Sequence, residues 1–247
     1  MKARLTVILS IILICLASVS FAGLSKLEDG LISAWTFDDG SAKDSVGSNH
    51  GKFKNGAKTA GGGKAGKALM LDNPTNPAKG KNTGQYVEIP SSASLEQADG
   101  IFSISFWANI KEGGGRNHSG IFFKGLKIGW GDHFMVRIAT TSNVNLTWGS
   151  CWKGAEGWFA TDNTYKEGEW FHGSYVVDGK TATAYVTSSV TKGTVVPASG
   201  QDNPKPIELP LLTFPDKPIE IGVGRQQGGV EGQDFWIDGM VDEIYMW

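Results

Sequence analysis

The sequence predicts an all-β chain that folds as a two-sheet antiparallel β-sandwich. Short segments with apolar residues at alternate positions recur along the chain, and turn-forming Gly, Pro and Asn residues separate them. No segment shows the 3.6-residue apolar period of an amphipathic helix. A single open sheet would leave one face of each alternating strand without a partner. Two sheets packed face to face are therefore expected.

The first 22 residues are predicted to be a secretory signal peptide. Two basic residues precede a largely apolar run from Leu5 to Ser18, and Ser20 and Ala22 are small residues that suit cleavage before Gly23. The run is short for a membrane span, although an uncleaved N-terminal anchor is the alternative. We expect an exported protein, secreted, periplasmic or at the cell surface, with no membrane span after cleavage.

Residues 23–247 are predicted to form one domain with a sizeable core, because 40% of the chain is hydrophobic and it contains nine Trp. Loss of Lys2 and Arg4 with the signal peptide moves the net charge from −2 to −4. This balance gives no attraction for nucleic acid or an anionic membrane surface. Cys15 also leaves, so Cys151 has no intramolecular partner and a disulfide framework is excluded.

The strand signal is strongest from Phe102 to Ile110, where Ser103, Ser105, Trp107 and Asn109 alternate with apolar residues. The other predicted strands, in chain order, are ALMLD, QYVEIP, HFMVRIAT, VNLTW, WFHGSYVV, TATAYVTSS, PIEIGVG and MVDEIYMW. Asp178-Gly179 supplies the residues of a tight hairpin turn. The segment from Lys192 to Pro218 holds six of the nine prolines and is expected to be a long irregular connection.

Several of these stretches together resemble the laminin-G-like jelly roll of the concanavalin A-like lectin/glucanase superfamily. They are GLISAWTFDDGS, KDSVGSNHGKF, GGGKAGKALMLD, QYVEIPSS, FSISFWANI, GEWFHGSYVVDGKTATAYV and IDGMVDEIYMW. The resemblance covers about Gly30 to Trp247, and it departs from the family pattern between Gly125 and Tyr165 and in the proline-rich insertion before Ile219. It implies two curved sheets with the first and last strands side by side, often in a noncatalytic module that binds carbohydrate or protein. The superfamily also contains hydrolases and lyases.

No catalytic residues are predicted. Laminarinase-type enzymes of the superfamily carry Glu-x-Asp-x-Glu on one strand, and the nearest candidate here has Asp238 and Asp242 with Met240 between them. Asp242 and Glu243 are adjacent, so in a regular strand they would point to opposite faces. Gly-x-Ser-x-Gly and His-Glu-x-x-His patterns are also absent.

A structural calcium ion is predicted at Asp38, Asp44 and Asp242, with a backbone carbonyl from Asn49 or His50. The acidic loop fails the EF-hand spacing, but calcium also binds carboxylates and carbonyls of irregular loops. The resemblance implies that the last strand brings Asp242 close to this loop. The alternative is that the Asp residues only cap backbone amides in turns.

Trp148, Trp152 and Trp158 are predicted to bind a ligand, because they lie within eleven residues of a Gly-rich stretch that regular strands explain poorly. Exposed in a loop, their rings would stack on sugar rings. The alternative is a small satellite core that covers one end of the sandwich. Trp107 is a second candidate, because alternation places it opposite the core.

The expected function is noncatalytic binding of a carbohydrate by an exported module. A protein-interaction, adhesion or structural module is the alternative, and a glycan hydrolase or lyase is less favoured. The expected partner is a glycan or an extracellular protein.

Overall fold

The computed structural model describes residues 28–74, 83–115, 118–125, 132–138, 145–152, 155–162, 164–194, 201–225 and 234–247. The predicted signal peptide lies outside these ranges. No helix within them is long and apolar enough to cross a membrane.

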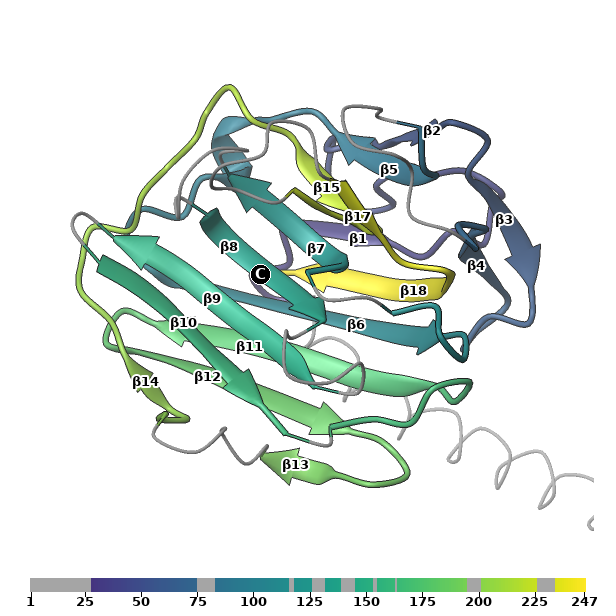
Figure 1. The fold of residues 1–247 in the computed structure, drawn as a ribbon. Helices are drawn as coiled ribbons and strands as arrows, with labels where there is room; N and C mark the ends of the chain where they lie inside the picture. The colour runs from purple at the N-terminus through teal and green to yellow at the C-terminus, as the bar shows by residue number, and fades with distance from the viewer. Residues whose placement is uncertain are drawn as a thin grey trace, which may run out of the picture.

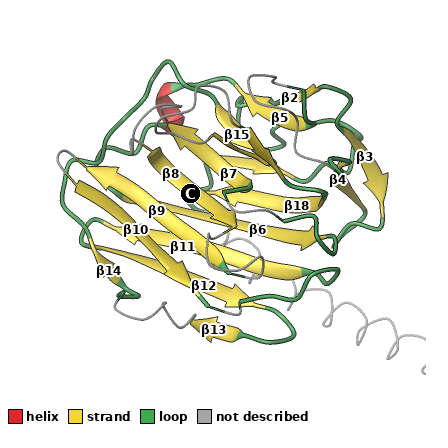
Figure 2. Cartoon of the chain, viewed as in Figure 1, coloured by secondary structure: helices red, strands yellow, loops and turns green. Residues whose placement is uncertain are grey.

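Two antiparallel sheets pack face to face, which confirms the predicted sandwich (Figures 1 and 2). Sheet A has the strand order β13 (Lys192–Thr194), β12 (Thr181–Thr187), β11 (Phe171–Asp178), β6 (Ile101–Ile110), β18 (Gly239–Met246), β4 (Lys67–Leu71) and β3 (Lys58–Gly61), with β1 (Ser33–Trp35) beside β18 and β14 (Lys205–Pro206) beside β12. Sheet B has the order β10 (Ala155–Thr161), β9 (Leu146–Trp152), β8 (Asp132–Ile138), β7 (Gly120–Gly125), β15 (Ile219–Ile221), β5 (Tyr86–Ile89) and β2 (Lys52–Lys54). A two-stranded sheet of β16 (Val223–Arg225) and β17 (Asp234–Trp236) and a 3₁₀ turn, η1 (Ala93–Leu95), complete the described elements.

Strand β6 shows how the sequence pattern becomes a core. Its alternate residues from Phe102 to Ile110 are buried, and the residues between them are partly buried on the opposite face. Burial of each large apolar side chain contributes about 1.5–3 kcal/mol. Buried hydrophobic residues from both sheets form one large cluster, so the face of sheet A that carries Ser105 and Trp107 points away from the core. We call this the outer face of sheet A.

The predicted hairpin joins β11 and β12. Oδ1 of Asp178 accepts hydrogen bonds from the amides of Lys180 and Thr181, and Gly179 has a positive φ of 83°. Within β11, a Cβ added at Gly173 would come within 2.5 Å of the Phe106 ring. The glycine therefore gives the phenylalanine room to pack across the strand.

The sequence prediction is wrong for the tryptophan-rich stretch, which forms the regular hairpin β9–β10 rather than a loop. Its glycines are the reason, since they resemble turn signals in the sequence. Gly149 lies inside β9, opposite Trp158, and a Cβ there would lie 3.0 Å from Cβ of Trp158. A glycine in a strand can thus mark close packing instead of a turn.

The first and last described strands lie side by side, as the resemblance implies, with Trp35 opposite Ile244. Strand β18 also contains a β-bulge on its β6 side. Asp242 pairs with Trp107 and Tyr245 pairs with Ser105, so β18 spans this interval with one more residue than β6. Glu243, inside the bulge, has a φ of 49°.

Candidate functional site

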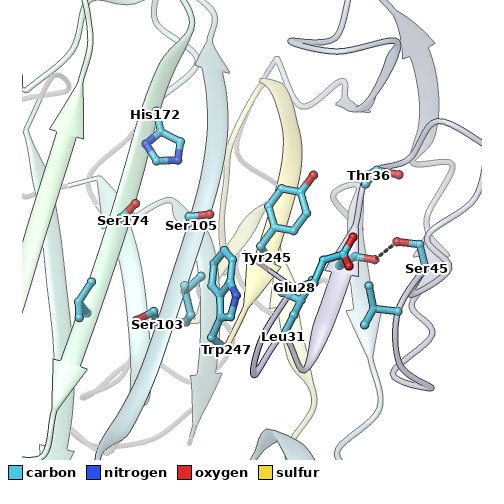
Figure 3. Close-up of a pocket in the computed structure, with 14 residues that line it drawn as sticks. Glu28, Leu31, Thr36, Ser45, Ser103, Ser105, His172, Ser174, Tyr245 and Trp247 are labelled. Carbon is cyan, nitrogen blue, oxygen red and sulfur yellow. Dashed lines mark hydrogen bonds between the residues drawn. The ribbon is translucent and has the colours of Figure 1, made fainter. Parts of the chain in front are cut away.

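A hollow of about 960 Å³ lies on the outer face of sheet A (Figure 3). Strands β1, β6, β11 and β18 form its floor, and the segments before and after β1 form one rim. The lining residues are Glu28, Leu31, Ala34, Thr36, Ser45, Val46, Ser103, Ile104, Ser105, His172, Ser174, Val176, Tyr245 and Trp247. We call this hollow the groove.

The groove follows from the side chains that face one another across the strands. Ser174 of β11 lies opposite Ser105 of β6, and Ser105 lies opposite Tyr245 of β18. We call this line of residues the central row. Serine side chains are small, so the outer face is hollow along the row.

Larger residues stand on both sides of the central row. On one side, His172 lies opposite Trp107 and their ring centroids are 5.1 Å apart. On the other side, Ser103 exchanges two 3.0 Å backbone hydrogen bonds with Trp247. The Trp247 ring lies 5.9 Å from the ring of Tyr245, and the close-up shows both rings beside the serines (Figure 3). The groove therefore has a floor of hydroxyl groups and aromatic walls.

The bulge in β18 places the two C-terminal aromatic rings in the groove. Val241 faces the core before the bulge, and Ile244 and Met246 face it afterwards. Because strand side chains alternate, an uninterrupted strand that buries Val241 would also turn residues 245 and 247 inward. The extra residue reverses this order, so Tyr245 and Trp247 are only partly buried and lie on the outer face.

The side chains of the groove are held mainly in uncharged forms. Burial lowers the pKa of His172, so its imidazole is neutral at pH 7. Burial, and then the hydrogen bond that its hydroxyl donates to Glu243, raise the pKa of Tyr245, which keeps its proton. Beside the groove, Nζ of Lys64 lies 4.1 Å from the centroid of the Trp107 ring.

Asp44 shapes the rim of the groove. Its Oδ1 accepts hydrogen bonds from the amides of Ala34 at 3.0 Å, Val46 at 3.1 Å and Gly47 at 2.9 Å. Burial alone would raise the pKa of Asp44, but these hydrogen bonds outweigh it, and the pKa is lowered. The buried carboxylate thereby fixes the backbone of Val46, a rim residue, against β1.

The three carboxylates predicted to bind calcium do not form one site. Asp38 and Asp242 both hold the turn before β4, since the amide of Lys67 donates to Oδ1 of Asp38 and that of Lys64 to Oδ2 of Asp242. Asp44 instead binds amides beside β1. No group of three or more potential metal-ligating His, Cys, Asp or Glu residues occurs in the described ranges. These residues match the alternative of amide capping, and calcium binding by the chain stays a prediction.

The prediction of an exposed tryptophan platform is wrong for Trp148, which is fully buried. Its ring lies 6.1 Å from that of Phe106, and its Nε1 donates to Oγ1 of Thr161 at 3.3 Å. The regular hairpin is the reason, because alternation in β9 turns this ring into the core. Trp158 is partly buried on β10 of sheet B, and the side chain of Trp152 lies outside the described residues.

Sequence reasoning found a residue beside the groove. Trp107, the second candidate, lies on the outer face next to His172, which lines the groove. Tyr245 and Trp247 were missed, because alternation without the bulge assigns them to the core face. The sequence does indicate that the serines lie on the outer face, since they alternate with buried residues in FSISF and HGSYV.

Asp238 and Glu243, two carboxylates considered for catalysis, each interact with a side chain that is not a carboxylate. Oδ1 of Asp238 lies 2.7 Å from Nζ of Lys111, and Glu243 accepts a hydrogen bond from the hydroxyl group of Tyr245. The bulge places Glu243 outside regular strand geometry, so its simple alternation with Asp242 does not apply.

No protein-family model matches this chain, and no curated protein sequence does. Solved structures do match. Domain 4 of an extracellular GH43 arabinanase from Geobacillus stearothermophilus, in complex with arabinotriose, is 18% identical with a TM-score of 0.55, over 87% of this chain and 91% of that one.

Two botulinum neurotoxin structures are also similar. Type C, whose cell entry is dependent upon interaction with two ganglioside molecules, is 13% identical with a TM-score of 0.59 over 91% of this chain. The binding domain of type DC in complex with SialylT is 12% identical with a TM-score of 0.55 over 89% of this chain. The matches span 49% and 48% of those two toxin chains. At these identities the likeness shows a shared β-sandwich fold.

Proposed function

We propose that this protein is an exported, noncatalytic, laminin-G-like jelly-roll module that binds carbohydrate in the groove. One observation carries the proposal: a row of serine hydroxyls lies between aromatic rings on an accessible sheet face. Sugars present apolar ring faces that stack on aromatic side chains, and hydroxyl groups that exchange hydrogen bonds with polar ones. The groove offers both kinds of contact within one surface.

Structural neighbours support a binding role for the fold. The arabinanase domain was solved with arabinotriose, and cell entry of the type C neurotoxin depends on interaction with two ganglioside molecules. The arabinanase is an extracellular enzyme, which agrees with the export proposed from the N-terminal sequence.

Binding to a panel of polysaccharides and glycans tests this function, with Ser105→Phe as the blocking variant. The new ring would fill the hollow from the middle of the central row without touching the core. Asn109→Phe is the matched control, because Asn109 lies on the same strand and face outside the groove and loses only a 3.3 Å bond to the Gly168 carbonyl. We expect binding by the wild type and the control and loss of binding by Ser105→Phe.

Two results would refute the proposal. One is the absence of binding to every glycan in the panel. The other is binding that Ser105→Phe leaves unchanged, which would place the ligand elsewhere. Turnover of a bound polysaccharide, abolished by substitution of Asp238 or Glu243, would overturn the noncatalytic part alone.

A further inference from the structure

We propose that the groove binds an uncharged polysaccharide chain, which runs across the strands and reaches a further subsite at Tyr185, outside the hollow. This inference rests on the proposed function and adds the direction, the charge class and the extent of the ligand.

The central row gives the direction. Tyr185 of β12 lies opposite Ser174, and Ala34 of β1 lies opposite Tyr245. The row therefore continues across β12, β11, β6, β18 and β1. Neighbouring strands are about 4.8 Å apart, so a row over five strands is about 19 Å long. A ligand in the hollow runs along this row, because the larger Trp107 and Trp247 stand on its two sides.

The row is accessible on the β12 side. Tyr185 there is 40% exposed, so a ligand that leaves the hollow in this direction can continue over its ring. On the β1 side the row meets the rim, where Val46 is 53% exposed. A sugar chain longer than the hollow therefore extends toward Tyr185.

Tyr185 has the chemistry of a sugar subsite. Five large hydrophobic residues of the described ranges are exposed, and Tyr185 is the aromatic one among them. Across the sheet, Tyr185 is the next residue of the row after Ser105 and Ser174. An exposed aromatic ring next to hydroxyl groups repeats the combination found at Tyr245 and Ser105.

The charges of the groove select an uncharged ligand. Among the described lining residues, Glu28 is the side chain with a formal charge at pH 7, and none is Lys or Arg. Carboxylated and sulfated sugars are recognised by Arg, Lys or clusters of N–H donors. Glu28 and the nearby Glu243 would instead repel them, and Lys64, which lies over the Trp107 ring, stands outside the lining residues. Hydroxyl groups and a neutral imidazole suit a sugar chain without acidic groups.

Titration calorimetry with linear arabino- and gluco-oligosaccharides, from the trisaccharide to the hexasaccharide, tests the inference. We expect affinity to rise with length, and Tyr185→Ala to weaken hexasaccharide binding about tenfold, as for one lost stacking contact, while trisaccharide binding is unchanged. Tyr185→Phe should keep the wild-type affinity, since it keeps the ring. Leu209→Ala, at another exposed apolar residue, is the control. Oligogalacturonides of equal length should bind more weakly.

The inference would be overturned by affinity that does not rise with length, by equal losses for both lengths in Tyr185→Ala, or by preference for oligogalacturonides. The proposed function would still stand if Ser105→Phe blocked the trisaccharide in those cases. The inference would also be overturned if neither neutral series bound at all. If a glycan of another kind then bound and Ser105→Phe blocked its binding, the proposed function would stand without the inference.

Discussion

The amide of Lys64 donates a 2.7 Å hydrogen bond to Oδ2 of Asp242, although 178 residues separate the two in the sequence. Ala65 donates to the same oxygen at 3.2 Å, and the amide of Glu243 donates to Oδ1 at 2.9 Å. One buried carboxylate therefore ties the turn before β4 to the bulge of β18. The bulge in turn places the aromatic wall of the groove.

Asp242 should make stability fall as the pH rises. Burial raises its pKa from 3.8 to about 6, despite the three amide hydrogen bonds, so the folded state binds the proton more tightly than the unfolded state. The free energy of unfolding should then decrease by about 3 kcal/mol between pH 4 and pH 6 because of this group. Urea unfolding of the wild type and Asp242→Asn across this range measures the contribution. Parallel pH profiles would contradict it.

His118 should have the opposite effect. Burial, with Arg137 nearby, lowers its pKa from 6.5 to about 4, so the unfolded state binds the proton first on acidification. The free energy of unfolding should fall by about 3 kcal/mol as the pH decreases from 6.5 to 4. His118→Asn removes the titration and suits the positive φ of 69° at this position. Equal acid sensitivity of variant and wild type, followed by urea unfolding, would refute this role.

Trp148→Ala should lower the free energy of unfolding by about 3–5 kcal/mol, because it empties a fully buried site in the core. Trp158→Ala, at a partly buried residue of the facing strand, should cost less. Neither change should alter the glycan affinity of the folded protein, since both residues belong to sheet B. Loss of glycan binding in Trp148→Ala, with an unchanged free energy of unfolding, would instead support the predicted tryptophan platform.

Calcium removal tests the predicted ion. The predicted ion requires a lower Tm with EDTA than with added calcium, whereas the same Tm is expected if the carboxylates of Asp38, Asp44 and Asp242 only accept backbone hydrogen bonds. Elemental analysis of the purified protein provides the second measurement. A lower Tm in EDTA, with about one calcium per chain, would show that an ion contributes to stability.

The sandwich could be predicted because the alternation of apolar and polar residues along a strand follows the burial of its two faces. In β6 every second residue from Phe102 to Ile110 is buried, as the sequence pattern indicates. The hairpin at Asp178-Gly179 is equally local, since its turn chemistry lies within four residues. The glycines of the β9–β10 hairpin misled the prediction, because a glycine that permits close cross-strand packing resembles a glycine in a turn.

The groove was only partly predictable because it depends on register between distant strands. Trp107 and the serines of β6 could be assigned to the outer face from one segment. Their neighbours Ser174 and Tyr245 come from strands far away in the sequence, and pairing decides which side chains meet. The sequence shows that the loop near Asp44 is acidic, but it does not show that backbone amides are the hydrogen-bond partners of Asp44.

The bulge makes the last strand depend on its length as well as its composition. Deleting Glu243 would leave Ile244, Tyr245, Met246 and Trp247 in the chain but exchange their faces, with two aromatic rings forced toward the interior and two aliphatic side chains turned to solvent. A one-residue deletion would therefore disturb the core and the groove together, whereas a substitution at one of these positions changes one side chain on one face. A single residue thus decides which side chains of the last strand face the groove.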